Sequence, residues 1–319
     1  MKRIVALIAV CILYCCAVLP ASAAEYPSRG LRLIVPFNPG GGGEQAVRLI
    51  EKDFREVTGQ SLSFIYKPGG TGLIGAMDLS RQRPDGYTIG VGSYPLLVVD
   101  VISGRAPYTL DSFDFISLLC LADVYLVVRA DSPFKTAEEL FAQVRENPGR
   151  VNLGICEILG PTHIPALQLK KAGLPFNHVP IDGAGRVVPA LLGGQIDAAL
   201  VPGDGASAAM GKMRVLASAS EARSAFFPDA PTFRELGFDI VSGVGRYIAA
   251  PRGIPAKARA GLENILRSLL ERPDVKERYR LAGTVATWKS GDELRAMFEA
   301  YAATVRPLID AYKAEAGGR

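Results

Sequence analysis

The chain reads LRLIVPFNPGGGG from Leu31 to Gly43 and LSFIYKPGGTG from Leu62 to Gly72, and these two stretches decide the fold. In each of them a short apolar run leads into a glycine turn, and helical patterns follow the turns over 44–58 and 73–82. This order predicts two strand–loop–helix units next to each other in one sheet. Glycine lets loop amides approach a ligand closely, and the free N–H groups of a helix start suit an anion. The two loops therefore predict one wall of a small-molecule site.

Apolar runs alternate with helical patterns over the rest of the chain. The strand candidates are 88–91, 115–121, 125–128, 151–155, 176–179, 198–201, 215–218 and 247–250. The helix candidates are 136–146, 162–172, 185–192, 232–236, 256–270, 273–281 and 291–309. Strands separated by helices predict parallel β–α–β units and an α/β fold, in which ligands bind beyond the carboxyl ends of the strands. Both glycine loops fall at such ends, as do residues 92–94, 160–163 and 181–185.

The N-terminus has the pattern of a secretory signal peptide over residues 1–23. A basic start precedes an uncharged apolar run over 4–19, and Ala21-Ser22-Ala23 supplies the small residues of a cleavage site. The run is too short and too near the terminus to favour a transmembrane helix. An uncleaved anchor and a lipoprotein modified in the Cys15-Cys16 pair are the alternatives. The pattern predicts export to the periplasm.

Removal of 23 from the 319 residues leaves 296, enough for two domains of ordinary size. The mature chain would carry 34 basic and 32 acidic residues, and this near-neutral balance argues against a nucleic-acid partner. Cys120 and Cys156 would remain after cleavage. Both lie in apolar runs, so buried free thiols are expected, and a disulfide between them is the alternative.

The sequence contains few motifs for catalysis or cofactor binding, and those that occur are incomplete. Residues 70–75 match G-x-G-x-x-G, but the next strand ends in GVGS and lacks the carboxylate that would hold a ribose. Gly40 to Gly43 lacks the Lys-Ser/Thr of a nucleotide-binding P-loop, and no G-x-S-x-G elbow occurs. His163 and His178 are the only histidines, and their spacing makes no metal motif on one helix. We therefore expect no catalysis, no cofactor and no metal.

A series of segments resembles one family. The segments are YPSRGLRLIVPFNPGGGG, GQSLSFIYKPGGTGLIGA, RPDGYTIGVGS, GPTHIPALQLKKAG, NHVPIDGAGRVVPALLGGQIDAAL, GKMRVLASASEARSAFFPDAPTFRELGF and IAAPRGIP. In order and spacing they are similar to the solute-binding proteins of tripartite tricarboxylate transporters, the Bug family. The likeness runs from about Tyr26 to about Leu308.

The resemblance implies a type II periplasmic binding-protein fold, in which two Rossmann-like α/β domains close on a ligand like a flytrap. By analogy the first domain is 24–127 plus 249–319 and the second is 128–248, with crossings near Val127–Arg129 and Ile248–Pro251. Family members bind an organic acid and pass it to a membrane permease of two other subunits. The resemblance therefore implies a periplasmic binding protein, expected as a monomer, for a small carboxylate.

Loop pattern and resemblance together give one set of candidate ligand-binding residues. These are Phe37, Asn38, Gly41, Gly42, Gly43, Glu44, Gly70, Thr71, Gly72, Ser93, Tyr94, Thr162, His163, Asp182, Asp204 and Arg246. The two glycine loops would hold one carboxylate, and the second domain would hold the other polar end. For His163, packing at a helix start is an equal alternative to ligand contact.

Several positions depart from the family pattern. The first loop ends in Glu44 where the family has PGGGTD, Asp182 replaces a base, and Arg246 replaces an aromatic residue before the second crossing. The segment 201–205 also lacks the usual Asp-Asn register. Arg246 could bind a ligand carboxylate with its planar guanidinium, it could pair with Asp182, Asp204 or Glu44, or its side chain could be solvated. Asp182 with Arg246 would suit a zwitterion.

Two other functions stay open at the level of sequence. A binding protein of this kind could act as a sensor component that signals to a membrane kinase, and the membrane partner of its closed form would distinguish the two roles. An enzyme that uses the glycine loops for a cofactor is the third possibility. Bound cofactor in the purified protein would favour that reading.

Overall fold

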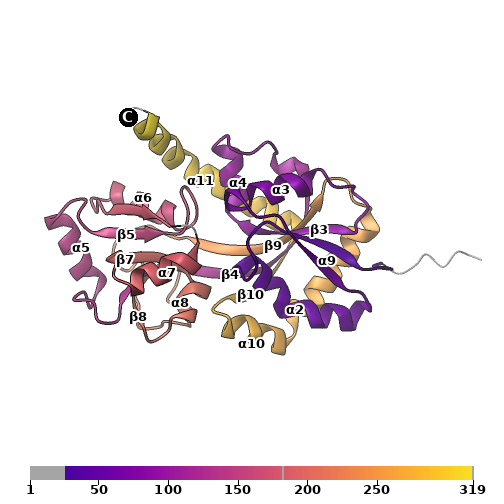
Figure 1. Cartoon of the computed structure of the whole chain (residues 1–319), viewed down its shortest axis with the longest axis horizontal. Coiled ribbons are helices and arrows are strands. Elements are labelled where there is room, and N and C mark those ends of the chain that lie inside the picture. The colour runs from indigo at the N-terminus through magenta and orange to yellow at the C-terminus, as the bar shows by residue number, and fades with distance from the viewer. Residues whose placement is uncertain (1–25, 182, 318–319) are drawn as a thin grey trace, which may run out of the picture.

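The computed structural model describes residues 26–181 and 183–317. They form two α/β domains side by side, and the strands β4 (Phe113–Arg129) and β9 (Gly243–Pro251) run between them (Figure 1). The expected class, two α/β domains joined by two segments, is confirmed. The signal peptide predicted over 1–23 lies outside the described residues.

The sheet of the first domain contains both glycine-loop units. Its strand order is β2 (Leu62–Tyr66), β1 (Leu31–Val35), β3 (Thr88–Tyr94), β9 and β4, with β10 (Val285–Ser290) paired to β4. One face is covered by α2 (Gly42–Thr58), α9 (Ala256–Glu271) and α10 (Pro273–Leu281). The other face is covered by α3 (Leu73–Ser80), α4 (Leu96–Ile102) and α11 (Gly291–Gly317). Short 3-10 turns lie at Gly70–Gly72 and Leu110–Ser112.

The second domain is built on the far half of β4. There β4 pairs with β7 (Ala198–Pro202) and β8 (Met213–Ser218), and β5 (Asn152–Ile155) and β6 (Asn177–Pro180) continue the sheet beyond β7. The helices α5 (Ala137–Glu146) and α6 (His163–Lys171) cover one face. The helices α7 (Ala184–Leu192) and α8 (Gly203–Ala208) cover the other.

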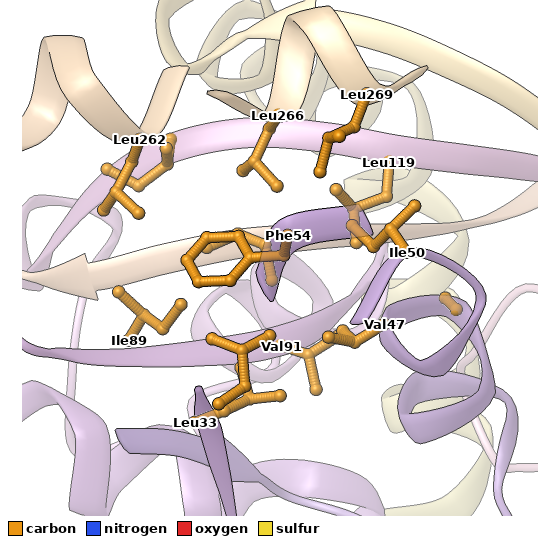
Figure 2. Packing of buried hydrophobic residues seen from close by; sticks show 14 of the residues in the cluster. Leu33, Val47, Ile50, Phe54, Ile89, Val91, Leu119, Leu262, Leu266 and Leu269 are labelled. Atoms are coloured by element: carbon orange, nitrogen blue, oxygen red, sulfur yellow. The ribbon is translucent and has the colours of Figure 1, made fainter. Parts of the chain in front are cut away.

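Buried apolar side chains from distant parts of the chain hold the first domain together. Figure 2 shows Phe54 of α2 between strand residues such as Ile89 and helix residues such as Leu262. The side chains of this cluster are almost fully buried, with Phe54 at 2% exposure. Because α2 packs on the same strands that carry the glycine loops, the core fixes the direction in which its first turn points.

The crossing strands differ from the sequence expectation. The runs 115–121 and 125–128 are parts of a single strand, β4, because Asp123 continues the extended backbone instead of breaking it. β4 pairs with β9 up to Asp123 and with β7 from Val124 onward. The change of partner therefore lies three residues before the crossing expected at Val127–Arg129. At the second crossing, where the chain leaves the second domain, β9 pairs with the first-domain half of β4 from Gly243 onward. This pairing begins before the crossing expected at Ile248–Pro251.

The sheets are mixed, because the expected parallel β–α–β units are joined by antiparallel strands. β1, β2 and β3 are parallel to one another, as are β5, β6 and β7, but β9 is antiparallel to β3, and β4 is antiparallel to β7. The crossing strands enter each sheet from the other domain, so they run against its β–α–β strands. The helix expected at 232–236 is a series of turns, and β10, α4 and α8 were not foreseen.

Two further contacts join the domains. On one side, α11 extends from the first domain toward α6 (Figure 1), where Ile309 packs with Leu159 and Ile164 of the second domain and Val99 of α4. On the other side, α8 begins against the turn at Gly283, so closely that a Cβ on Gly203 would lie 2.4 Å from the Gly283 carbonyl oxygen. The domains are therefore in contact beyond the two strands.

Candidate functional site

A cleft of about 1020 Å³ lies between the domains. Its first wall consists of the two glycine loops (36–43 and 68–72) with Ser93, all at the carboxyl ends of β1, β2 and β3. Its second wall consists of the loop after β5, the start of α7 and helix α8, and Arg246 of β9 lies between the walls. The cleft is therefore at the sheet edge where open α/β folds bind ligands.

The first glycine loop presents unpaired backbone donors. Within the described residues, the amides of Gly42, Gly43 and Glu44 have no hydrogen-bond partner, as expected for the first turn of a helix. The helix dipole adds partial positive charge at this end. Gly42 and Gly43 line the cleft. This end of α2 can therefore bind an anion such as a carboxylate.

Glu44 does not line the cleft, contrary to its place among the candidate residues. Its carboxylate is buried behind the loop, where it accepts hydrogen bonds from the Tyr66 hydroxyl at 2.6 Å, the Gly40 amide at 2.8 Å and Arg48 at 3.1 Å. The Tyr66 hydrogen bond, followed by that of Gly40, holds the pKa of Glu44 below its ordinary value. Glu44 therefore holds the loop in position.

The second glycine loop follows an unusual backbone path. Gly69, Gly70, Thr71 and Gly72 all have positive φ, and Thr71 adopts φ 55° although its side chain is β-branched. Such a conformation costs a non-glycine residue of order 1–3 kcal/mol. This backbone path brings Gly72 so close to the Phe37 ring that a Cβ on Gly72 would lie 3.3 Å from the ring. Gly43 of the first glycine loop also lies against this ring. Phe37 thus joins the two loops at the cleft wall.

Arg246 connects the walls of the cleft. Its Nη1 donates to Ser93 Oγ at 2.6 Å, and its Nη2 lies 3.8 Å from Asp204 Oδ2 of α8. A Cβ on Gly42 would lie within 2.7 Å of both charged groups, so a side chain at this position would have to displace them. Among the alternatives stated for Arg246, the structure gives the ion pair with Asp204. The guanidinium also lines the cleft, so contact with a ligand is compatible with this pair.

The second wall carries a carboxylate that the sequence pattern did not single out. Glu157 lines the cleft, and its Oε1 accepts hydrogen bonds from the Thr162 amide and hydroxyl, both at 2.8 Å. Burial raises the pKa of Glu157 to about 7. An acid two residues after the strand 151–155 was the available signal, since ligands bind at such strand ends.

Tyr94 and His163 lie outside the cleft, contrary to expectation. Tyr94 packs edge-on or tilted against Phe298 and Tyr301 of α11, and burial raises its pKa to about 12. His163 is 2% exposed, and its Nδ1 accepts a hydrogen bond from the Leu159 amide. Desolvation lowers its pKa to about 3, so the ring is neutral and donates through Nε2 toward His178. Helix-start packing is therefore the role that the structure gives His163.

The other candidate residues gather at one place. Those that line the cleft are Phe37, Asn38, Gly41, Gly42, Gly43, Gly70, Thr71, Gly72, Ser93, Thr162, Asp204 and Arg246. Asp182 lies outside the described residues. Arg186 and Lys212 also line the cleft and were not foreseen.

Neither a cluster of metal ligands nor a membrane-spanning helix occurs within residues 26–181 and 183–317. In that part of the chain no three His, Cys, Asp or Glu side chains gather as metal ligands would. No helix there has the length and apolar character needed to cross a bilayer. Cys120 and Cys156 are both buried and free.

A two-domain α/β fold with an interdomain cleft defines the class of periplasmic solute-binding proteins, and comparison with known proteins gives the family. Residues 46–312 match the model of the tripartite tricarboxylate transporter family receptor, and the chain belongs to this family. The BugT protein of Bordetella pertussis is 29% identical, over 92% of this chain and 93% of its own. Receptors of this family bind solutes and are not enzymes.

Solved structures agree with this assignment. A TctC solute-binding protein from Polaromonas is 28% identical with a TM-score of 0.73, and the match covers 90% of this chain and 99% of that one. MatC from Rhodopseudomonas palustris, whose structure contains bound malate, is 25% identical with a TM-score of 0.79. That match covers 89% of this chain and all of MatC.

Proposed function

We propose that this receptor captures a small organic acid in the interdomain cleft and delivers it to the membrane permease subunits of a tripartite tricarboxylate-type transporter. The proposal includes export by the signal peptide over residues 1–23 and action as a monomer in the periplasm. A malate-bound relative supports a carboxylate as the ligand. The second domain, expected over 128–248, would then close on the first around the crossing strands.

One observation carries the carboxylate proposal. The amides of Gly42 and Gly43 lack partners within the described residues and line a cleft that Arg246 also lines. Backbone N–H groups at a helix start and a guanidinium are both donors that suit a carboxylate. Because the walls come from different domains, a ligand held by both would favour the closed arrangement.

A thermal-shift screen tests the proposal. The chain from residue 24 onward is mixed with monocarboxylates, dicarboxylates and amino acids. A ligand at 100 times its dissociation constant adds about 2.7 kcal/mol to the free energy of unfolding. For a chain of this size that raises the melting temperature by roughly 2–4 °C per kcal/mol. Stabilisation by one class of acid supports the proposal, and absence of stabilisation by every carboxylate contradicts it.

Membrane delivery needs a separate test. The ligand-loaded protein is mixed with the detergent-solubilised permease subunits, and binding is compared with that of the ligand-free protein. Preferential binding of the loaded form supports the transporter role. Binding to a membrane kinase in place of the permease would favour the sensor role instead.

A further inference from the structure

The loop after β5 is shaped around the side chain of Glu157. A Cβ on Gly160 would lie 2.0 Å from Glu157 Cγ, so the side chain occupies the space that glycine leaves free. Leu159 adopts φ 59°, and its amide donates to His163 Nδ1. A residue held in this sparsely populated region requires support from its surroundings, and such residues cluster at functional sites. The loop therefore fixes one position of the Glu157 carboxylate at the cleft wall.

The two oxygens of Glu157 are not equivalent. Oε1 accepts from the amide and the hydroxyl of Thr162, and the Thr162 hydroxyl itself accepts from the Cys156 amide. This chain of hydrogen bonds commits the hydroxyl to donate to Glu157, which favours the ionised carboxylate. Among the described residues, no hydrogen bond is made to Oε2. One acceptor oxygen of a cleft-lining acid is thus available to a ligand.

The charges of the cleft indicate what this oxygen accepts. Glu157 and Asp204 both line the wall of the second domain, and the guanidinium of Arg246 is engaged by Ser93 and lies beside Asp204. Arg186 and Lys212 line the same wall, but no described cation forms an ion pair with Glu157. A second ligand carboxylate beside Glu157 would meet an unpaired acid, whereas a cationic nitrogen would supply the direct counter-charge that this side chain lacks.

We propose that Glu157 is the specificity-determining residue of the second domain and that its Oε2 accepts a hydrogen bond from a cationic nitrogen of the ligand. The ligand is then a monocarboxylate with an ammonium group at its other end, held by the glycine loops at the first wall and by Glu157 at the second. This inference rests on the proposed function, because it requires a carboxylate at the glycine loops.

The ionisable groups that face Glu157 set the expected pH dependence. They are the Cys156 thiol beside it, Tyr301 on α11 and Arg246 on β9, while Asp204, Arg186 and Lys212 line the same cleft. Burial raises the pKa of Cys156 and of Tyr301, so neither ionises near neutral pH. Glu157, with its pKa of about 7, changes charge between pH 6 and pH 8. The affinity for an ammonium ligand should therefore rise about tenfold over that range.

Calorimetric titration with three matched ligand series tests the inference. The series are ω-amino acids of three to six carbons, the plain alkanoic acids and the α,ω-diacids of the same lengths. In the unchanged protein, one ω-amino acid should bind at least tenfold more tightly than its matched alkanoate and diacid. Glu157→Gln should abolish this preference and its pH dependence. The exposed Glu221→Gln is the matched control in the same domain.

A second variant guards against a fold defect in the first. Gly160→Ala would displace the Glu157 side chain without changing its charge and should also abolish the preference. A diacid that binds more tightly than its amino acid, with affinity that falls as the pH rises, would overturn the inference and leave the carboxylate function standing. If Glu157→Gln and the unchanged protein preferred the ω-amino acid equally, the inference would also be overturned and the carboxylate function would stand. No binding in any series would overturn both.

Discussion

Glu44 shows how a charged side chain shapes a binding loop without touching the ligand. Its carboxylate accepts hydrogen bonds from the Gly40 amide and the Tyr66 hydroxyl behind the loop, so the amides of Gly42 and Gly43 stay free to face the cleft. An acid at the start of a helix also interacts favourably with the helix dipole. The same residue type at Glu157 faces the cleft instead. Position in the packed structure therefore separates the two roles.

Glu44→Gln is expected to destabilise the protein and to weaken carboxylate binding. The Glu44 carboxylate accepts hydrogen bonds at both of its oxygens. The NH2 group of Gln would replace one of these oxygens, so a donor would face either the Gly40 amide or the Tyr66 and Arg48 donors, and that hydrogen bond would be lost. A disrupted buried hydrogen bond of this kind costs about 1–3 kcal/mol. Urea denaturation at pH 7 measures the loss, with Glu56→Gln on the exposed face of the same helix as the control. Equal stability of the two variants would contradict the assigned role.

The effect of pH on this variant has a defined sign. Folding lowers the pKa of Glu44, so its contribution to stability is present at neutral pH and is lost as the pH falls below about 4.3. The difference between Glu44→Gln and the unchanged protein should therefore shrink between pH 5 and pH 3. A difference that grows toward low pH would contradict the assignment.

At the scale of elements, strand β4 and helix α8 determine how the domains meet. β4 serves both sheets because its side chains are buried almost continuously along all 17 residues. α8 begins at Gly203, where the backbone comes so close to the Gly283 carbonyl that a side chain has no room. A pair of glycines thus sets the distance between the second domain and the turn before β10.

Gly203→Ala is expected to push α8 away from this turn. The added Cβ would lie 2.4 Å from the Gly283 carbonyl oxygen, which is backbone and cannot move aside. Overpacking of this kind costs about 1–3 kcal/mol. Small-angle scattering of the ligand-free protein should show a larger radius of gyration than that of Gly185→Ala, a control whose Cβ would meet nothing within 4 Å. Identical scattering profiles would argue against a tight contact at Gly203.

At the scale of the whole molecule, α11 binds the two domains together opposite the α8 contact. Its residues Val305 and Ile309 pack with Leu159 and Ile164 of the second domain, and Tyr312 meets His163 edge-on. The same loop of the second domain carries Glu157 into the cleft. The packing of α11 is therefore expected to influence both interdomain stability and the position of the binding loop.

Ile309→Ala tests this coupling. Ile309 is fully buried, so its truncation should cost about 2–5 kcal/mol. Scanning calorimetry should show a melting temperature lower by several degrees and a broader transition, because the domains share less buried surface. Leu281→Ala, at a site that is 69% exposed, is the control and should melt like the unchanged protein. An undiminished single sharp transition in Ile309→Ala would refute the coupling.

The two strand–glycine–helix units, the α/β class and the family could all be predicted from the amino-acid sequence. Local rules suffice for these features, since the apolar runs at 31–35 and 62–66 coincide with β1 and β2. The capping box at Thr136 and Glu139 likewise forms as the residue types require. Such signals depend on neighbours within a few positions.

Which side chains of the loops enter the cleft depends on tertiary packing, and the sequence did not predict it. Tyr94 is turned away because Phe298 and Tyr301, more than 200 positions later, provide its packing. His163 is buried against Tyr312, and Glu157 faces the cleft because Gly160 leaves room for it. β4 is one strand because two separate sheets each pair with half of it. These outcomes depend on contacts between segments far apart in the chain, and no local pattern contains that information.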